Sequence, residues 1–236
     1  MKRIAITQSN YIPWKGYFDL IAAVDELVLL DNVQYTRRDW RNRNIIKTAH
    51  GARWLTIPVK TRGLYQQTIE ETVASNDDWR EDHWLAVKQS YERARCFSDF
   101  AVSVRALYLG STERHLSKIN LEFLVALCRK LGIQTPLSSA SEYATDGTKT
   151  ARLIGICRSA RATHYLSGPA AKAYIEPEQF EEAGIVLEYM DYSGYPEYHQ
   201  LHGTFDHHVT VLDLLFNEGS EAQGYLKYVG RKGPQS

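Results

Sequence analysis

The order of apolar and polar stretches along the chain predicts a parallel α/β fold. Arg3–Thr7 and residues 26–30 are apolar runs of strand length, and residues 16–24 between them have the spacing of a helix. A strand, a helix and a second strand joined by short links form the unit that places two parallel strands side by side. We therefore expect Arg3–Thr7 and residues 26–30 to be buried neighbours in a central sheet.

The pattern continues less regularly towards the C-terminus. Residues 44–47 and 54–59 flank His50-Gly51 and predict a β-hairpin. Three apolar stripes at helical spacing between 78 and 131 predict a helical insertion, which ends at Gly132. Beyond it we expect strands at 133–138, His164–Ser167 and 185–190, and helices at Lys149–Ser159, 177–183 and 209–217.

These elements predict one domain. A chain of 236 residues is long enough to bury a sizeable core, and its sequence contains no repeat or low-complexity linker. We expect a single Rossmann-like α/β domain over residues 1–229, with a central, mainly parallel sheet and the helical insertion at about 78–131. Residues 230–236 are expected to be a disordered tail.

The charge and hydropathy of the chain indicate which classes of binding partner to expect. Lys plus Arg and Asp plus Glu each number 28, so the net charge is zero and no global field attracts nucleic acid. No stretch reaches the roughly 18 apolar residues of a membrane span, and the short basic start lacks the apolar segment of a signal peptide. We expect a cytoplasmic protein that binds a small molecule and not nucleic acid, in an oligomeric state that the sequence leaves open.

The first group of candidate site residues follows the first strand. The group lies in the loop and at the helix start after Arg3–Thr7 and comprises Gln8, Tyr11, Trp14, Lys15 and Tyr17. In a doubly wound sheet, ligands bind outside the carboxyl ends of the strands. Gln8 is suited to hydrogen-bond a base, sugar or amide, and the Tyr11 and Trp14 rings are suited to stack on one. The alternative for Trp14 is a hydrophobic plug under the following helix.

A second group follows the second strand. Asp31 ends that strand, where a carboxylate can serve in catalysis or bind a sugar hydroxyl, and Tyr35 comes soon after it. Arg43, Asn44 and Lys47 lie in the first strand of the expected hairpin. Arginine forks beside aromatic rings suit a phosphorylated or nucleotide-linked ligand. A basic loop with interleaved aromatics is also typical of RNA binding, which the neutral overall charge disfavours.

The third group lies in the last third of the chain. Ser167-Gly168 follows a predicted strand, in a turn whose backbone can approach a ligand closely. Segment 192–208 is rich in Tyr and His and contains Tyr195, His199 and His207. A histidine beside an arginine-rich wall stays neutral near pH 7, so His199 and His207 are candidate general bases. The alternative is a surface loop whose histidines face solvent.

No known ligand or cofactor motif accompanies these groups. The histidines form no HExxH motif, the three cysteines form no CxxC pair, and the GxGxxG, GxxxxGK[ST] and GxSxG motifs are missing. We therefore expect no metal site, no disulfide and no cofactor bound through a motif, while a nucleotide-containing donor or substrate stays open. Asp213, on an otherwise apolar helix, is either a core carboxylate or a group that orients a catalytic histidine.

A set of short motifs runs from residue 4 to about residue 219. They are Gln8-x-x-Tyr11-x-Pro13-Trp14-x-Gly16-Tyr17-Phe18, Asp31-x-Val33-Gln34-Tyr35, Trp40-x-Asn42-Arg43-Asn44, Trp54-Leu55-Thr56-x-Pro58-Val59, Tyr165-Leu166-Ser167-Gly168 with Tyr174, Tyr195-Pro196 with Gln200, and Leu212-Asp213-Leu214-Leu215-Phe216-Asn217. Together they resemble the WbqC-like family. His208-Val209-Thr210-Val211 departs from the family pattern, which affects only the start of the last helix.

This resemblance implies a bacterial protein associated with O-antigen and other surface-glycan gene sets, which acts on a nucleotide-linked or lipid-linked amino sugar. A weaker similarity in layout, from Pro13-x-x-Gly16 to Asp25-Glu26-Leu27-Val28, connects the start of the chain with HIGH-type nucleotidyltransferases. Trp14 and Tyr17 stand where those enzymes have histidines, which puts adenylylation in doubt.

Three functions stay open. The first is a transferase that moves an acyl or aminoacyl group to an amino sugar in surface-polysaccharide or glycoconjugate synthesis. His199 or His207 would be the base, and Tyr11, Tyr35, Arg43 or Asn44 would stabilise the developing charge. The second is a nucleotidyl-transfer or ligase-like enzyme, which would require Mg²⁺ and a nucleoside triphosphate. The third is a non-catalytic ligand-binding module of a glycan-assembly complex.

Overall fold

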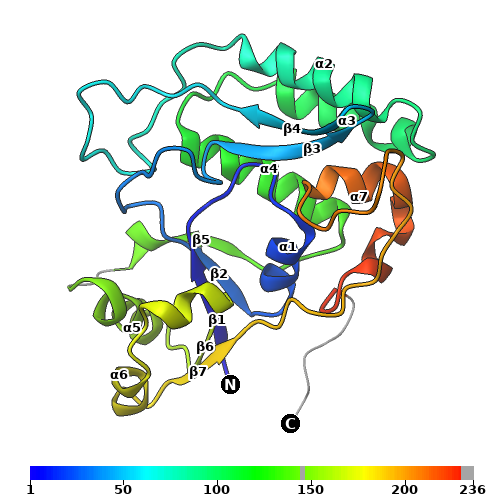
Figure 1. The fold of residues 1–236 in the computed structure, drawn as a ribbon. Helices are drawn as coiled ribbons and strands as arrows, with labels where there is room; N and C mark the ends of the chain where they lie inside the picture. Colours follow the sequence, from blue (N-terminus) through cyan, green and yellow to red (C-terminus); the bar gives the residue numbers. More distant parts are fainter. Residues whose placement is uncertain (144–146, 230–236) are drawn as a thin grey trace.

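The computed structural model describes residues 1–143 and 147–229, which contain a central sheet of five parallel strands (Figure 1). Neighbouring strands run parallel throughout, and the sheet order is β5-β2-β1-β6-β7. The strands are β1 (Arg3–Thr7), β2 (Glu26–Leu29), β5 (Leu137–Ser139), β6 (His164–Ser167) and β7 (Val186–Tyr189). The predicted Rossmann-like α/β class, with Arg3–Thr7 beside the second strand, is confirmed.

The central strands are apolar on both faces because helices cover both sides of the sheet. Ile4 and Ile6 of β1 point into one core, and Ala5 between them points into the other. Helices α5 and α6 close the first core, and α1, α4 and α7 close the second. Their bounds are α1 Lys15–Ala22, α4 Leu116–Lys130, α5 Lys149–Ser159, α6 Pro177–Glu182 and α7 Val211–Glu218.

Between β2 and β5 the chain forms the predicted hairpin and helical insertion. The hairpin is an antiparallel pair, β3 (Arg43–Thr48) and β4 (Gly51–Thr56). Helices α2 (Trp79–Tyr91) and α3 (Phe97–Leu109) follow it, and all four elements lie in the upper part of Figure 1. The backbone amide of Lys47 in β3 donates to the Tyr91 hydroxyl of α2 over 3.0 Å, which joins the hairpin to the helices.

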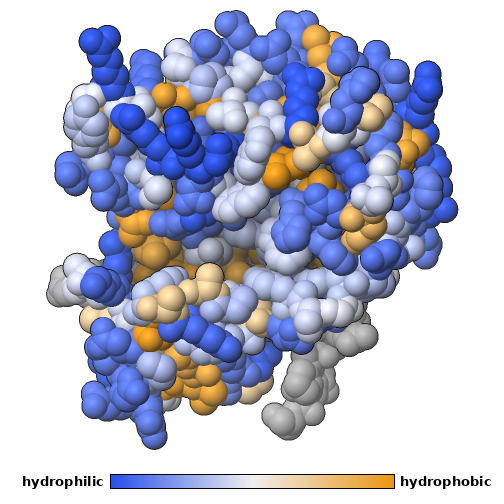
Figure 2. Space-filling model, viewed as in Figure 1, coloured by the Kyte–Doolittle hydropathy of each residue, from blue (hydrophilic) through white to orange (hydrophobic). Residues whose placement is uncertain are grey.

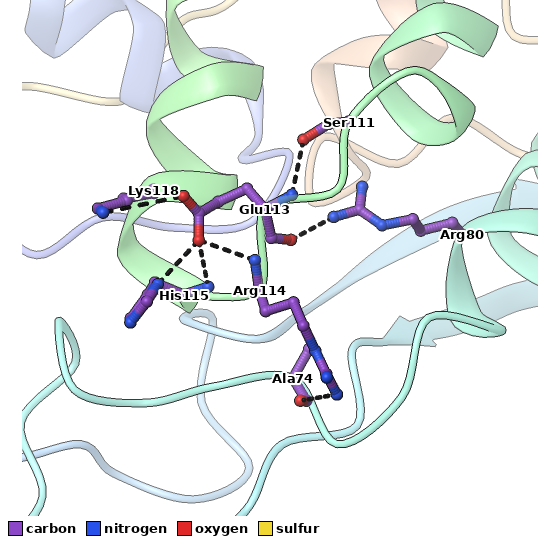
Figure 3. Close-up of polar contacts among 7 residues, drawn as sticks. All are labelled: Ala74, Arg80, Ser111, Glu113, Arg114, His115 and Lys118. Atoms are coloured by element: carbon purple, nitrogen blue, oxygen red, sulfur yellow. Dashed lines mark hydrogen bonds and ion pairs between the residues drawn. The ribbon is translucent and has the colours of Figure 1, made fainter.

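The connection between α3 and α4 is held by one carboxylate (Figure 3). Glu113 Oε1 accepts hydrogen bonds of 2.8 Å from the backbone amides of Arg114 and His115 and lies 2.8 Å from His115 Nδ1. The Arg80 guanidinium of α2 donates to the Glu113 backbone carbonyl. A carboxylate here satisfies the amides of the two residues that precede α4 and lies near the positive end of the helix dipole.

One predicted strand is shorter than expected for a physical reason. The strand predicted at 133–138 is confined to Leu137–Ser139, because the residues before it complete the C-terminus of α4. Gly132 has a φ of +70°, and the Ile133 amide donates to the Cys128 carbonyl over 2.9 Å. The remaining connections include three short 3-10 helices, Ala140–Glu142, Pro169–Ala173 and Gly219–Tyr225.

After β7 the chain returns to the insertion as an irregular segment, residues 191–210, which we call the strap (Figure 1). The end of the strap is fixed by two hydrogen bonds of 2.9 Å, from the Thr210 amide to the Ile45 carbonyl and from the Val211 amide to the Pro13 carbonyl. Helix α7 then packs against β3 and α3. The predicted disorder of 230–236 concerns residues outside the described ones.

Candidate functional site

A cavity of about 750 Å³ lies at the carboxyl edge of the sheet, where the strand order reverses between β1 and β6. The chain leaves these two strands toward opposite faces of the sheet, which opens a crevice between the connections. Figure 2 shows the hollow between the upper and lower parts of the molecule, with apolar side chains at its base. Its lining comes from the loops after β1 and β2, the start of α5 and the turn after β6.

Hydrogen bonds to Gln8 and Ser9 hold the loop after β1 in place. The Tyr17 hydroxyl donates to the Gln8 carbonyl over 3.0 Å, and the Ser9 amide donates to the Asp31 carboxylate over 2.8 Å. The Ser117 hydroxyl of α4 donates to the other oxygen of Asp31. Asp31 is buried and therefore braces the loop against β2 and α4 instead of facing the cavity.

The Trp14 indole lies against the first turn of α1 because Gly16 has no side chain. A Cβ atom at residue 16 would lie 2.3 Å from Cζ2 of Trp14. Ile12 has a φ of +36°, a left-handed conformation that β-branched residues rarely adopt. Tyr192 of the strap packs edge-on against Trp14, with ring centroids 5.1 Å apart. Trp14 is therefore fixed between α1 and the strap, where it forms one wall of the cavity.

Three cationic side chains, Arg41, Lys149 and Arg152, form what we call the basic wall of the cavity. Lys149 and Arg152 belong to the first turn of α5, and Arg41 donates to Asn10 Oδ1 and lies 3.4 Å from the Asp39 carboxylate. Among the described residues, the lining includes no Asp or Glu. The Nε atoms of Arg41 and Arg152 are buried without a hydrogen-bond partner in the same residues. Such a wall beside a helix N-terminus is suited to bind a phosphate or carboxylate.

The rest of the polar lining is aromatic or uncharged. Tyr165, Tyr174 and Tyr192 contribute rings or hydroxyls, and Ser167 and Gly168 form the turn after β6. The Tyr165 hydroxyl lies 3.3 Å from Ser167 Oγ. Burial raises the pKa of Tyr192 to about 12, so its hydroxyl is neutral at pH 7. Cations, rings and hydroxyls together suit a phosphorylated ligand with a ring system.

Five residues that the sequence analysis singles out line this cavity, namely Gln8, Trp14, Tyr17, Ser167 and Gly168. Val33 and Arg41 line it as well, so the segment after β2 shares the cavity with the loop after β1. Their position at the ends of neighbouring parallel strands explains why these loops meet. The part these residues play in substrate binding stays a prediction.

Tyr11 and Asn44 lie outside this lining. Tyr11 is fully buried, and its hydroxyl donates to the Tyr108 hydroxyl over 3.1 Å and lies 2.9 Å from Nδ1 of His83. Trp79 packs edge-on against the same ring. The Asn44 amide donates to the Tyr11 carbonyl over 2.9 Å. Both side chains therefore hold the loop after β1 to the insertion.

Arg43, Lys47 and Tyr35 also lie away from the cavity lining among the described residues. The Arg43 guanidinium stacks on Trp54, with Cζ 4.2 Å from the ring centroid. Lys47 is buried, and its ammonium donates to Gln200 Oε1 and to a strap carbonyl. Tyr35 lines a separate surface pocket, and burial raises its pKa to about 12.

The strap residues gather around Lys15 of α1. The Lys15 ammonium lies 5.0 Å from the Tyr195 ring centroid and donates to a strap carbonyl over 3.0 Å. Burial lowers the pKa of His207 below its ordinary value, and the charge of Lys15 acts in the same direction. His199 is exposed. Tyr195 approaches the cavity wall, with its ring centroid 6.0 Å from that of Trp14. The roles of Tyr195 in binding and of both histidines as bases stay predictions.

Asp213 of α7 is buried among tyrosines. Burial raises its pKa, and the Tyr198 and Tyr91 hydroxyls and the Lys47 charge act against that shift. The Asn217 amide donates to the Asp213 backbone carbonyl over 2.8 Å. Of the two interpretations of this residue, the structure supports a core carboxylate.

A smaller pocket of about 250 Å³ adjoins the cavity, and we call it the outer pocket. It is lined by Asn10, Pro13, Trp14, Trp40, Asn44 and His208. Asn10 and Trp14 line both spaces, so the outer pocket continues the cavity toward the hairpin. His208 Nδ1 lies 3.0 Å from the Asp206 carboxylate, which leaves Nε2 as the imidazole nitrogen for a ligand.

The residues of the basic wall were not among the predicted site residues. Lys149 and Arg152 begin a helix that was correctly predicted, and their spacing places both side chains on one helix face. A helix start after a parallel strand is a known anion site, so this signal was available. No sequence signal indicates that the Arg41 side chain points into the cavity. Its orientation depends on an irregular turn in which Arg38 has a φ of +58°.

Within residues 1–143 and 147–229, no three His, Cys, Asp or Glu side chains are grouped so that they could hold a metal ion. In the same residues, each helix is too short or too polar to cross a membrane.

Comparison with known proteins gives two matches. The sequence model of the WbqC-like protein family matches residues 8–225. An uncharacterized protein of Mycobacterium tuberculosis is 47% identical over 228 residues, which are 97% of this chain and 99% of that protein. No solved structure matches the chain. The span matched by the family contains the basic wall, the outer pocket and the strap.

Proposed function

The chain belongs to the WbqC-like protein family, and we propose that it is a cytoplasmic transferase that modifies a nucleotide-linked or lipid-linked amino sugar. The transferred group is acyl or aminoacyl, and the product enters a bacterial surface polysaccharide or glycoconjugate. The cavity between β1 and β6 is the substrate site. The observation that carries the proposal is the basic wall of that cavity, Arg41, Lys149 and Arg152.

The basic wall favours a ligand that carries phosphate. Arg41 is paired with the Asp39 carboxylate, whereas the described cavity lining offers no carboxylate to Lys149 and Arg152, so an anionic ligand would complete the balance of charge. The buried Nε atoms of Arg41 and Arg152 are also without partners in the described residues, and a phosphate oxygen satisfies such donors. A volume of about 750 Å³ lies in the range of small-molecule sites.

Transfer to a sugar amine needs a base near the amine. The neutral amine nitrogen attacks the acyl carbon of an activated donor, the donor's leaving group departs with the bonding electron pair, and the base takes a proton from the nitrogen. Among the four strap histidines His199, His202, His207 and His208, only His208 lines a described pocket beside the cavity. We therefore assign the base to His208, oriented by Asp206 through its Nδ1.

Ligand binding by purified protein tests the substrate site. UDP, GDP and inorganic diphosphate are titrated by calorimetry and thermal shift, and a ligand at a hundred times its Kd stabilises the protein by about 2.7 kcal/mol. Arg152→Gln and Lys149→Gln are expected to weaken binding at least tenfold. Arg158→Gln is the matched control, because Arg158 is an exposed residue in the last turn of the same helix.

Two results would reject the site: no phosphorylated compound binds the wild type, or Arg158→Gln weakens binding as much as Arg152→Gln. Once a ligand is found, mass spectrometry of the reaction separates the three functions. An acylated amino sugar supports the transferase, release of diphosphate from a nucleoside triphosphate supports nucleotidyl transfer, and binding without a product supports a binding module.

A further inference from the structure

Two tryptophans stand at the surface beside the outer pocket. Trp40 and Trp54 are 40% and 44% exposed, and their ring centroids are 5.3 Å apart. Arg43 covers the face of Trp54, whereas Trp40 lines the pocket. Exposed aromatic side chains that adjoin a pocket are typical of binding sites, because burial of such rings by a ligand is favourable.

The backbone of Trp40 is held in place without a ligand, and its ring lies against that of Trp54. The Tyr11 amide donates to the Trp40 carbonyl over 3.0 Å, and the Trp40 amide donates to the Asp39 carboxylate over 2.7 Å. Because Tyr11 is fully buried, this stretch of backbone is anchored to the core. A ring that is already positioned loses little conformational entropy when a ligand binds.

The remaining lining of the outer pocket offers hydrogen bonds without formal charge. Asn44 is engaged by Tyr11 and Ile45, and Asn10 Oδ1 accepts from Arg41, so the groups turned to a ligand are the Asn10 amide nitrogen and His208 Nε2. In the described part of the chain, this lining contains no Asp, Glu, Lys or Arg. A pyranose ring has C–H groups on its faces and hydroxyl or amino groups at its edges, so it matches an aromatic wall beside an amide and an imidazole.

We propose that the outer pocket is a sugar subsite that holds one pyranose ring, with Trp40 against the face of the ring and His208 at a ring substituent. The inference deepens the proposed function and rests on it, because Asn10 and Trp14 are shared with the cavity and so place the sugar beside the phosphate site. A lining without carboxylates also favours the neutral form of a sugar amine, which is the nucleophilic form.

Free glycosides test the subsite because they carry no phosphate. Methyl β-D-glucopyranoside and methyl N-acetyl-β-D-glucosaminide are titrated against the protein by saturation-transfer NMR. We expect saturable binding to the wild type, at least tenfold weaker binding to Trp40→Ala, and binding within about threefold of wild type for Trp40→Phe. Tyr65→Ala is the matched control and is expected to bind like wild type, because Tyr65 is an exposed aromatic residue of a separate pocket.

Different results would refute the sugar subsite and the phosphate site. Glycoside binding that depends on Trp40 supports the subsite even when UDP does not bind, a result that would count against the phosphate site alone. Failure of the wild type to bind either glycoside, unchanged binding by Trp40→Ala, or an equal loss in Tyr65→Ala overturns the subsite. Circular dichroism checks each variant, and Trp40→Gln replaces Trp40→Ala if the latter is unfolded.

Discussion

His83 is a histidine whose surroundings oppose a positive charge. Burial lowers its pKa to about 4, and its ring lies beside those of Tyr11 and Trp79. An unfolded chain titrates this group near pH 6.5. Between pH 6.5 and 4 the unfolded state therefore binds a proton that the folded state does not. The free energy of unfolding is unaffected by this group above pH 6.5 and decreases as the pH falls below it.

The change His83→Asn removes this titration and keeps a hydrogen-bonding group near Tyr11. Between pH 7 and 4.5, we expect the wild type to lose about 2 kcal/mol more of its free energy of unfolding than the variant. Urea denaturation at both pH values measures this difference. His50→Asn, in the exposed hairpin turn, should follow the wild type. Equal losses in the wild type and His83→Asn would contradict the argument.

Single residues of the candidate site were predictable where their position in the chain alone decides whether the side chain points into the cavity. Gln8 directly follows β1 and Ser167 ends β6, and both line the cavity. Tyr11 and Trp14 share an irregular loop without a period, in which Ile12 has a φ of +36°. That turn sends one ring into the core and the other to the cavity, a difference that residue type does not encode.

In α1, the absence of a side chain at Gly16 leaves room for the indole of Trp14. Ala in place of Gly usually stabilises a helix by about 1 kcal/mol. In Gly16→Ala, however, the new Cβ would lie 2.3 Å from Trp14, and we expect this clash to prevail, with a net loss of about 1 to 3 kcal/mol. Urea denaturation and tryptophan emission report stability and the displacement of Trp14.

Gly224→Ala, in the 3-10 helix Gly219–Tyr225, is the control for Gly16→Ala, because a Cβ at residue 224 meets nothing within 4 Å. Its stability should stay near that of the wild type. A Gly16→Ala protein as stable as Gly224→Ala, with unchanged emission, would show that Trp14 adapts without loss.

At the start of α4, the charge of Glu113 is the stabilising feature. Burial raises its pKa, but hydrogen bonds from His115 and Arg114 outweigh that effect and lower it to about 2. Its contribution is therefore complete above about pH 4.5 and is lost as the pH falls toward 2. We expect Glu113→Gln to reduce the free energy of unfolding by about 1 kcal/mol at pH 7 and less at pH 3.

Thermal and urea denaturation at pH 7 and pH 3 measure the effect of Glu113→Gln. Glu178→Gln, in the first turn of α6, removes an exposed carboxylate from another helix start and serves for comparison. A loss that does not shrink at pH 3, or one that Glu178→Gln reproduces, would show that the hydrogen-bonded charge of Glu113 is not its source.

The elements themselves were largely predictable because their periods reflect burial. Arg3–Thr7, Lys149–Ser159 and His164–Ser167 were predicted with the bounds observed. The short edge strand β5 was not, because the backbone after Gly132 completes the preceding helix before the strand begins. Local hydrogen bonding of this kind leaves no periodic signal in the sequence.

Across the whole molecule, Lys15 joins the start of the chain to the strap. It is 2% exposed, and burial lowers its pKa to about 8. An unfolded chain keeps this proton to about pH 10.4. Between pH 8 and 10.4 the unfolded state therefore binds more protons than the folded one, and this group makes folding more favourable as the pH rises.

The variant Lys15→Met has no group to titrate. From pH 7.5 to 9.5, we expect the free energy of unfolding of the wild type to rise relative to that of Lys15→Met, as measured by urea denaturation. Lys88→Met, which changes an exposed lysine of α2, should keep the wild-type trend. Parallel pH profiles for wild type and Lys15→Met would mean that Lys15 stays charged inside the aromatic cluster.

The position of α7 near the end of the chain also affects folding during synthesis on the ribosome. All eight of its residues, Val211–Glu218, are buried, and its Phe216 carbonyl accepts a hydrogen bond of 3.0 Å from the Cys96 amide at the start of α3. While a ribosome is still synthesising the residues before 211, the insertion has an unfilled apolar wall. We expect chaperones to engage the nascent chain in this interval, and a premature stop codon before 211 to yield aggregates instead of a shorter working protein.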